Sequence, residues 1–184
     1  MDANHALDLL KAGNARFVNE QPSNPRQNIA YRKSQILEQN PFCAVLTCSD
    51  SRIPVEILFD QGIGDLFVVR LAGNIASATA IESLDFAVHQ FDISLIVVMG
   101  HQNCGAVQSV IEGATGQHLE KIGAYISQAV EGKKNTIKAA VIANVDAQLK
   151  IVRDRLLIER RLVNQLTICG AYYDFETGYV NFLP

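Results

Sequence analysis

Four short apolar runs are spaced along the chain, and stretches with a helical pattern lie between them. The runs cover residues 41–48, 66–71, 94–100 and 166–172. They are rich in β-branched residues and largely apolar at consecutive positions, which is typical of strands buried on both faces of a parallel sheet. We therefore predict four strands at these positions.

Helical spacing marks the segments between the runs. Residues 80–91 repeat apolar side chains at intervals of three and four, and residues 1–17 form a second amphipathic pattern. A further helix is predicted directly after Cys104, and a longer one over residues 136–162. Strands that alternate with helices predict an α/β fold with a mainly parallel central sheet flanked by helices and right-handed crossovers.

The length of the chain fits one domain. It has 184 residues, 48% of them hydrophobic, with no Pro- or Gly-rich tract and no long run of like charge that would mark a linker. We predict a single domain over residues 1–184, with a helical N-terminal arm over residues 1–40 and an α/β core over residues 41–184. Ligands of such a core tend to bind where the parallel strands end.

Charge and hydropathy narrow the classes of partner. The formal charge of −3, with Lys and Arg spread along the chain, provides no basic surface for nucleic acid. The longest apolar runs are far shorter than the roughly 20 residues that a membrane span needs. The first residues lack the uninterrupted apolar core of a signal peptide. We expect a soluble, cytoplasmic protein with no nucleic-acid or membrane partner.

Two cysteines and a histidine follow the predicted strands. Cys48 ends the first run, and His101 and Cys104 come just after the third, in "GHQNCGAV". If these strands are parallel, the three side chains emerge at the same edge of the sheet. Two thiolates and one imidazole are ligands that Zn²⁺ prefers, and catalytic zinc sites keep a fourth position open. We therefore predict one zinc ion per chain, held by these three residues.

The other two cysteines are predicted to be structural. Cys43 and Cys169 lie inside apolar runs, where a small buried side chain is the usual role of cysteine. The four cysteines form no CxxC motif and no dense framework, so the spacing does not favour disulfides.

Longer motifs around these residues resemble a known family. Together, "GNARFV", "NPFCAVLTCSDSR", "FDQGIGDLFVVRLAGN", "GHQNCGAV" and "GAYYDFETGYV" look like a β-class carbonic anhydrase, and the resemblance covers nearly the whole chain. It implies a single β-carbonic-anhydrase-like domain with Cys48, His101 and Cys104 as zinc ligands. It also implies the reversible hydration of carbon dioxide to bicarbonate and a proton, which makes the protein a lyase.

Asp50 and Arg52 are the predicted catalytic pair. In an extended segment, both lie on the same side of the chain as Cys48. Arg52 can bind a carboxylate through two hydrogen bonds and so hold Asp50 off the metal. Asp50 can then accept a hydrogen bond from zinc-bound hydroxide and aim it at CO₂, which is also the role that the resemblance implies. The alternative is a surface ion pair worth about 0 to 1 kcal/mol.

The resemblance also raises the prospect of a closed form. In some relatives the matching aspartate becomes the fourth zinc ligand, and bicarbonate binds in a pocket beside a tryptophan. This chain has Val45 at that position and contains no Trp. Arg70, which would help to hold the anion, is present, but it can instead pair with a carboxylate at a dimer interface. We therefore favour the open form, in which Asp50 does not coordinate zinc.

Four residues are implied as substrate contacts. Gln39 matches a pocket glutamine, and Gly105 matches a glycine whose backbone N–H reaches the bound anion or Asp50. Phe67 and Phe86 match two aromatic residues that the neighbouring subunit supplies. The protein is then expected to be a homodimer or homotetramer with active sites at the dimer interface, and its N-terminal helix to cross to the partner. The alternative roles are a loop amide, a helix-start glycine and two core aromatics.

Three other functions fit parts of the sequence. A zinc hydrolase of the same fold would act on carbonyl sulfide or carbon disulfide, which are linear like CO₂. A metal-free enzyme would use Cys104 as nucleophile and His101 as base. A non-catalytic, zinc-stabilised interaction domain would need a closed set of four ligands. A measurement of metal content would distinguish the metal-free enzyme from the other functions.

Overall fold

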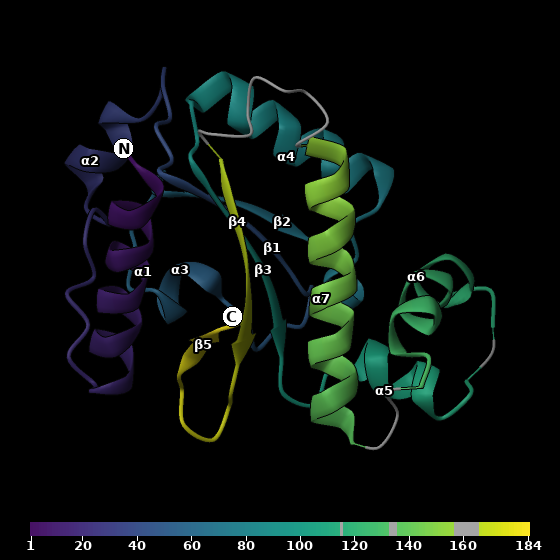
Figure 1. Cartoon of the computed structure of the whole chain (residues 1–184). Coiled ribbons are helices and arrows are strands. Elements are labelled where there is room, and N and C mark those ends of the chain that lie inside the picture. Colours follow the sequence, from purple (N-terminus) through teal and green to yellow (C-terminus); the bar gives the residue numbers. More distant parts are fainter. Residues whose placement is uncertain (115, 133–135, 157–165) are drawn as a thin grey trace.

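The computed structural model describes residues 1–114, 116–132, 136–156 and 166–184 (Figure 1). At its centre is a sheet in the order β2-β1-β3-β4-β5. The strands are β1 (Cys43–Thr47), β2 (Leu66–Arg70), β3 (Leu95–His101), β4 (Thr167–Tyr173) and β5 (Val180–Phe182). The first four are parallel, which confirms the predicted strands and fold class, and β5 pairs antiparallel with β4. Sequence reasoning missed β5 because three residues are too few to show a period.

Helices surround the sheet. They are α1 (Ala3–Val18), α2 (Ile29–Ser34), α3 (Val55–Leu58), α4 (Ala78–Phe91), α5 (Gly105–Ile111), α6 (Glu120–Val130) and α7 (Ile137–Leu156), with a 3-10 turn η1 (Ala72–Asn74). The predicted helices at α1, α4, α5 and α7 are confirmed, while predicted positions 157–162 lie outside the described residues. α2 lies within the predicted helical arm over residues 1–40, although no separate helix was predicted there, and sequence reasoning missed α3 and α6. Across the ranges that the structure describes, no helix has the length and apolar character of a membrane span.

Different helices cover the two faces of the sheet (Figure 1). Ala44 and Leu46 of β1 belong to the core formed with α4 and α7, whereas Cys43 and Val45 belong to the core formed with α1 and α3. All five residues of β1 are buried. This strand therefore has no solvent face, which explains its unbroken apolar run.

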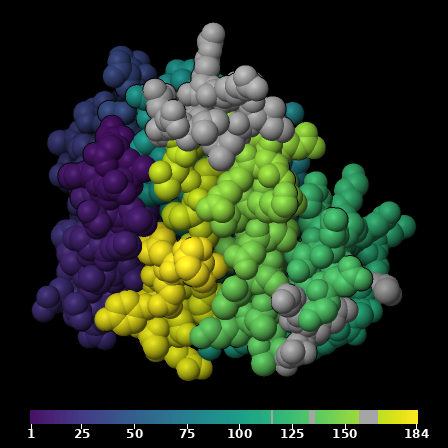
Figure 2. All heavy atoms as spheres, viewed as in Figure 1, coloured from purple at the N-terminus to yellow at the C-terminus, as the bar shows by residue number. Residues whose placement is uncertain are grey.

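The N-terminal helix α1 packs on the core of its own chain. Leu10 is fully buried, and Asn14 Oδ1 accepts a hydrogen bond from the Val180 backbone N–H at 2.9 Å. The backbone passes so near α3 that a Cβ at Gly13 would lie 1.7 Å from the Phe59 carbonyl oxygen. Figure 2 shows the N-terminal residues beside the C-terminal segment on one face of the molecule. Within one chain, this helix therefore covers the core of its own subunit, and its crossing to a partner stays a prediction.

Candidate metal centre

The predicted zinc ligands meet at the carboxyl ends of β1 and β3, which are adjacent and parallel. Cys48 directly follows β1, and His101 is the last residue of β3. The chain then turns through Asn103, whose φ of 51° lies in the left-handed region that asparagine tolerates. Cys104 comes next, as the N-cap residue of α5. The sheet register thus brings together two cysteines that are 56 positions apart.

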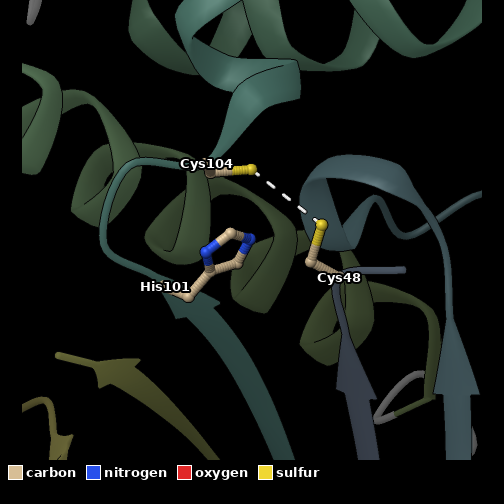
Figure 3. Close-up of side chains that lie close together, drawn as sticks. All are labelled: Cys48, His101 and Cys104. Carbon is tan, nitrogen blue, oxygen red and sulfur yellow. Dashed lines mark hydrogen bonds between the residues drawn. The ribbon is translucent and has the colours of Figure 1, made fainter. Parts of the chain in front are cut away.

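The three side chains point toward one another in the interior (Figure 3). The Sγ atoms of Cys48 and Cys104 are 4.0 Å apart, and one ligand atom from each of the three residues lies within 4.8 Å of the others. The exposed fractions are 4% for Cys48, 0% for His101 and 1% for Cys104. In the part of the chain that the structure describes, no other group of three His, Cys, Asp or Glu residues has this spacing.

The donor set fits zinc. Two zinc–sulfur bonds of about 2.3 Å at a tetrahedral angle place the sulfur atoms about 3.8 Å apart, close to the separation of the two thiols. His101 Nδ1 lies 2.9 Å from the Gln102 carbonyl oxygen. If Nδ1 donates to that oxygen, as is usual for a metal-binding histidine, Nε2 keeps its lone pair for a ligand. This buried Nε2 has no hydrogen-bond partner among the described residues, and a bound cation would satisfy it.

The acidities of the two thiols depend on each other, because their sulfur atoms are close together. A hydrogen bond from Cys104, then contact with His101 and with the backbone N–H groups of Asp50 and Gly73, lowers the pKa of Cys48 to about 4 despite its burial. The hydrogen bond with Cys48, reinforced by burial, raises the pKa of Cys104 well above its usual range. The lowered pKa of Cys48 favours its thiolate, which is the form of cysteine that binds a metal.

Asp50 and Arg52 form a bidentate ion pair beside this cluster. Arg52 Nε donates to Asp50 Oδ1 at 2.9 Å and an Arg52 terminal nitrogen donates to Oδ2 at 2.8 Å, and the Arg52 backbone N–H adds a third bond to Oδ1. The hydrogen bonds from Arg52 hold the pKa of Asp50 at about 2. Asp50 Oδ2 lies 3.9 Å from His101 Nε2. The carboxylate therefore borders the cluster but is held by Arg52.

Arg70 has a role that the sequence did not reveal. Its Nε donates to the Cys48 carbonyl oxygen at 3.1 Å, and a terminal nitrogen donates to the Asp50 carbonyl oxygen at 2.6 Å. Arg70 thus fixes the backbone that carries both a predicted ligand and the predicted catalytic aspartate. A carboxylate partner for Arg70 is not needed to explain its position in β2.

Phe175 links the ligand and the ion pair, and sequence reasoning also missed it. The Arg52 guanidinium carbon lies 4.5 Å from the centre of the Phe175 ring. The same ring makes an edge contact with His101, at 5.7 Å between ring centres. Phe175 follows β4 and reaches the site only through the sheet order. Its local sequence therefore carries no signal of this contact.

The predicted substrate residues lie apart from the cluster within one chain, except Gly105. Gln39 and Phe86 line a common groove of about 790 Å³, and Phe67 packs on Phe86 at 6.5 Å between ring centres. Phe67 pairs with Ala44, four positions before Cys48, which corresponds to about 13 Å along the strand. Gly105 begins α5 next to Cys104, and a Cβ there would meet open space.

Fold and site together define a class: an α/β protein with a buried Cys₂His cluster, whose donor set fits a metal ion, at the carboxyl edge of a parallel sheet. The family model for carbonic anhydrase matches residues 43–180. Carbonic anhydrase 2 of Mycobacterium tuberculosis is 32% identical over 186 aligned residues, which cover 94% of this chain and 89% of that protein. The chain therefore belongs to the β-class of the carbonic anhydrase family, and as a carbonic anhydrase it is a lyase.

Solved structures of the class share the fold. The Coccomyxa β-carbonic anhydrase in complex with acetazolamide superimposes with a TM-score of 0.73 at 26% identity, covering 96% of this chain and 85% of that one. A tetrameric β-carbonic anhydrase from Sordaria macrospora gives 0.75 at 22% identity, covering 98% and 97%. The agreement in fold extends over nearly the whole chain, and membership of the carbonic anhydrase family supports carbon dioxide hydration as the reaction.

Proposed function

We propose that the protein catalyses the reversible hydration of carbon dioxide to bicarbonate and a proton, with one zinc ion held by Cys48, His101 and Cys104. The observation that carries this proposal is the buried cluster, in which His101 Nε2 has no partner among the described residues and faces the Asp50 carboxylate. When bound, zinc supplies a hydroxide nucleophile near neutral pH by lowering the pKa of water. Three protein donors leave the fourth tetrahedral position for this reaction.

The chain's own residues orient the reaction. Asp50 Oδ2 is placed to accept a hydrogen bond from the attacking hydroxyl group, and this bond directs an oxygen lone pair at the CO₂ carbon. Arg52 holds both carboxylate oxygens of Asp50, so the carboxylate stays at the edge of the site and does not fill the fourth position. Gly105, at the start of α5, is proposed to offer its N–H to the bicarbonate product.

We also propose that the active unit is a homodimer, or a tetramer of such dimers, with the active sites at the dimer interface. Ile36, Leu37 and Phe86 are 75%, 91% and 55% exposed, and Gln39 shares the Phe86 groove. The residues that line this groove include none of the cluster. Dimer formation would bury these apolar side chains. It would also bring Gln39, Phe67 and Phe86 of one chain to the metal centre of the other.

Zinc analysis combined with stopped-flow CO₂ hydration tests the reaction. We expect about one zinc per chain and hydration that chelation abolishes and added zinc restores. Carbonyl sulfide and carbon disulfide are assayed on the same preparation. A metal-free protein, or a zinc protein that turns over the sulfur compounds but not CO₂, contradicts the proposal.

Mixing two inactive variants tests the shared site. Cys48→Ser removes a metal ligand, and Gln39→Ala removes a residue proposed to act in the partner's site. In a mixed dimer, the Cys48→Ser subunit would supply an intact Gln39 to the intact metal centre of the other subunit. Activity should therefore appear on mixing only if the site is shared between chains. Mixed dimers that form but stay inactive contradict the shared site.

A further inference from the structure

Two amide side chains are fully buried on the face of α7 that packs on the sheet. Asn144 and Gln148 are each 0% exposed and are separated by one helical turn. Their neighbours on this face are mainly aliphatic. Burying an amide costs free energy unless its polar atoms are hydrogen-bonded. The partners of these two side chains therefore indicate their role.

Both amides bond to the turn η1 and the residues that follow it. Asn144 Nδ2 donates to the Gly73 carbonyl oxygen at 2.8 Å and lies 3.3 Å from Asn74 Oδ1. Gln148 Oε1 accepts the Ala76 backbone N–H at 2.8 Å, and its Nε2 donates to Asn144 Oδ1 at 3.1 Å. The pair thus fixes both ends of the segment from residue 73 to residue 76.

This turn presents a hydrogen-bond donor to one of the predicted zinc ligands. The Gly73 N–H donates to Cys48 Sγ at 3.3 Å. Gly73 has a φ of 68°, and a Cβ there would lie 2.7 Å from Ile126 Cδ1. The position therefore requires glycine, and the packing leaves the turn little space. A thiolate that accepts an N–H bond holds its lone pairs more tightly, which changes the bond it makes to a metal.

We propose that Asn144 and Gln148 are positioning residues, which hold the Gly73 N–H against the Cys48 sulfur and thereby tune the bond between Cys48 and zinc. The proposal rests on the zinc site of the preceding subsection. A role limited to satisfying the backbone of the turn would affect stability alone. The two roles separate in measurements on the metal–sulfur bond.

The test compares the wild type with Asn144→Ala, Gln148→Met and Val152→Ala. Gln148→Met keeps the length of the side chain without its polar atoms. Val152 is fully buried on α7 one turn beyond Gln148 and has no side-chain hydrogen-bonding group, so its truncation is a matched control that weakens packing. Each protein is loaded with Co²⁺ to record the thiolate-to-metal charge-transfer band, and with Zn²⁺ to measure transfer of the metal to a chelator. Circular dichroism and thermal unfolding report the fold.

Both amide variants should move the charge-transfer band to lower energy, because the sulfur lone pairs lose a hydrogen bond. Zinc affinity should fall about 10- to 100-fold, the usual effect of losing an outer-shell partner. Val152→Ala should be less stable but should keep the wild-type band and affinity. If Asn144→Ala does not fold, Gln148→Met decides the question.

Two results overturn the proposal. In one, folded amide variants keep the wild-type band and zinc affinity. In the other, Val152→Ala changes both as much as the amide variants do, so that lost stability alone explains the effect. A wild-type cobalt protein without any thiolate band is a separate outcome, because it refutes the zinc site on which the proposal rests.

Discussion

Replacing Arg52 with alanine should release Asp50 toward the metal. In the wild type, two side-chain bonds of 2.9 and 2.8 Å hold the carboxylate, and the pKa of Asp50 falls from its ordinary 3.8 to about 2 through the hydrogen bonds from Arg52. A shift of this size corresponds to about 2 kcal/mol. Because the Arg52 side chain is 55% exposed, screening by solvent reduces its contribution to about 1 kcal/mol.

A free-energy loss of about 1 kcal/mol changes the ratio of open to closed forms by roughly 5-fold. Where the closed form then predominates, kcat/KM for CO₂ hydration should fall by up to that factor. Zinc content should stay at the wild-type value, since Arg52 holds no ligand atom. Stopped-flow kinetics measure the rate, and the absorption spectrum of the cobalt protein reports a carboxylate entering the coordination sphere.

Arg52→Lys is the matched control for charge. Lysine keeps the positive charge but cannot form the planar two-bond pair, so its rate should lie between those of the wild type and Arg52→Ala. An Arg52→Ala protein with full zinc and the wild-type kcat/KM would show that Arg52 is only a surface charge. Loss of zinc from this variant would show instead that Arg52 maintains the cluster itself.

Four further changes test other parts of the structure. Cys48→Ser or Cys104→Ser should lose zinc and most activity, because a hydroxyl is a far poorer zinc ligand than a thiolate; a variant with full zinc would contradict the ligand set. Phe175→Leu should keep zinc but lower kcat/KM several-fold, because Arg52 loses the ring under its guanidinium, whereas Phe175→Tyr should retain the rate. Burial opposes ionisation of Asp60, but hydrogen bonds from Arg16, Ser23 and Asn24 outweigh this effect and lower its pKa to about 2. At neutral pH the ionised carboxylate therefore adds about 2 kcal/mol to the free energy of unfolding, and this contribution is lost as the pH falls from about 3.8 to about 2. Urea unfolding should show Asp60→Asn to be destabilised at neutral pH and to lack this loss in acid. Because two thiolates neutralise Zn²⁺, kcat/KM should rise through the slightly alkaline range, and a flat pH profile would contradict the ligand set or the role of Asp50.

The strands and the three candidate metal ligands could be predicted because the patterns that mark them lie within short stretches of sequence. Unbroken apolar runs marked the four parallel strands, and parallel pairing then brought Cys48 and His101 to one edge. α2, α3 and β5 have six, four and three residues, which is too short for a period. The missed helix α6 is different, since Ile122, Ile126 and Val130 recur every four residues and could have indicated it.

The supporting residues could not be predicted, because their roles depend on contacts between distant segments. Gln148 bonds the backbone of Ala76, which is 72 positions away. Phe175 reaches Arg52 only because β4 pairs with β3, so that the residue after Tyr173 and Asp174 lies beside His101. In the sequence, Asn144 and Gln148 simply interrupt the apolar face of a helix. Such an interruption in a buried helix is a signal for a polar partner, although it does not identify which partner.

The contacts around β1 restrict which part of the site can move. The backbone after β1 is held at several points: Arg70 binds the carbonyl oxygens of Cys48 and Asp50, and the Ser49 N–H donates to the Leu71 carbonyl oxygen. The side chain of Asp50, in contrast, depends mainly on Arg52, which is half exposed. Any change between open and closed forms should therefore consist of rotation of the Asp50 side chain on a fixed backbone, with Cys48 left in place. A crystal structure of Arg52→Ala that shows the whole segment after β1 displaced would contradict this division between a rigid ligand frame and one mobile carboxylate.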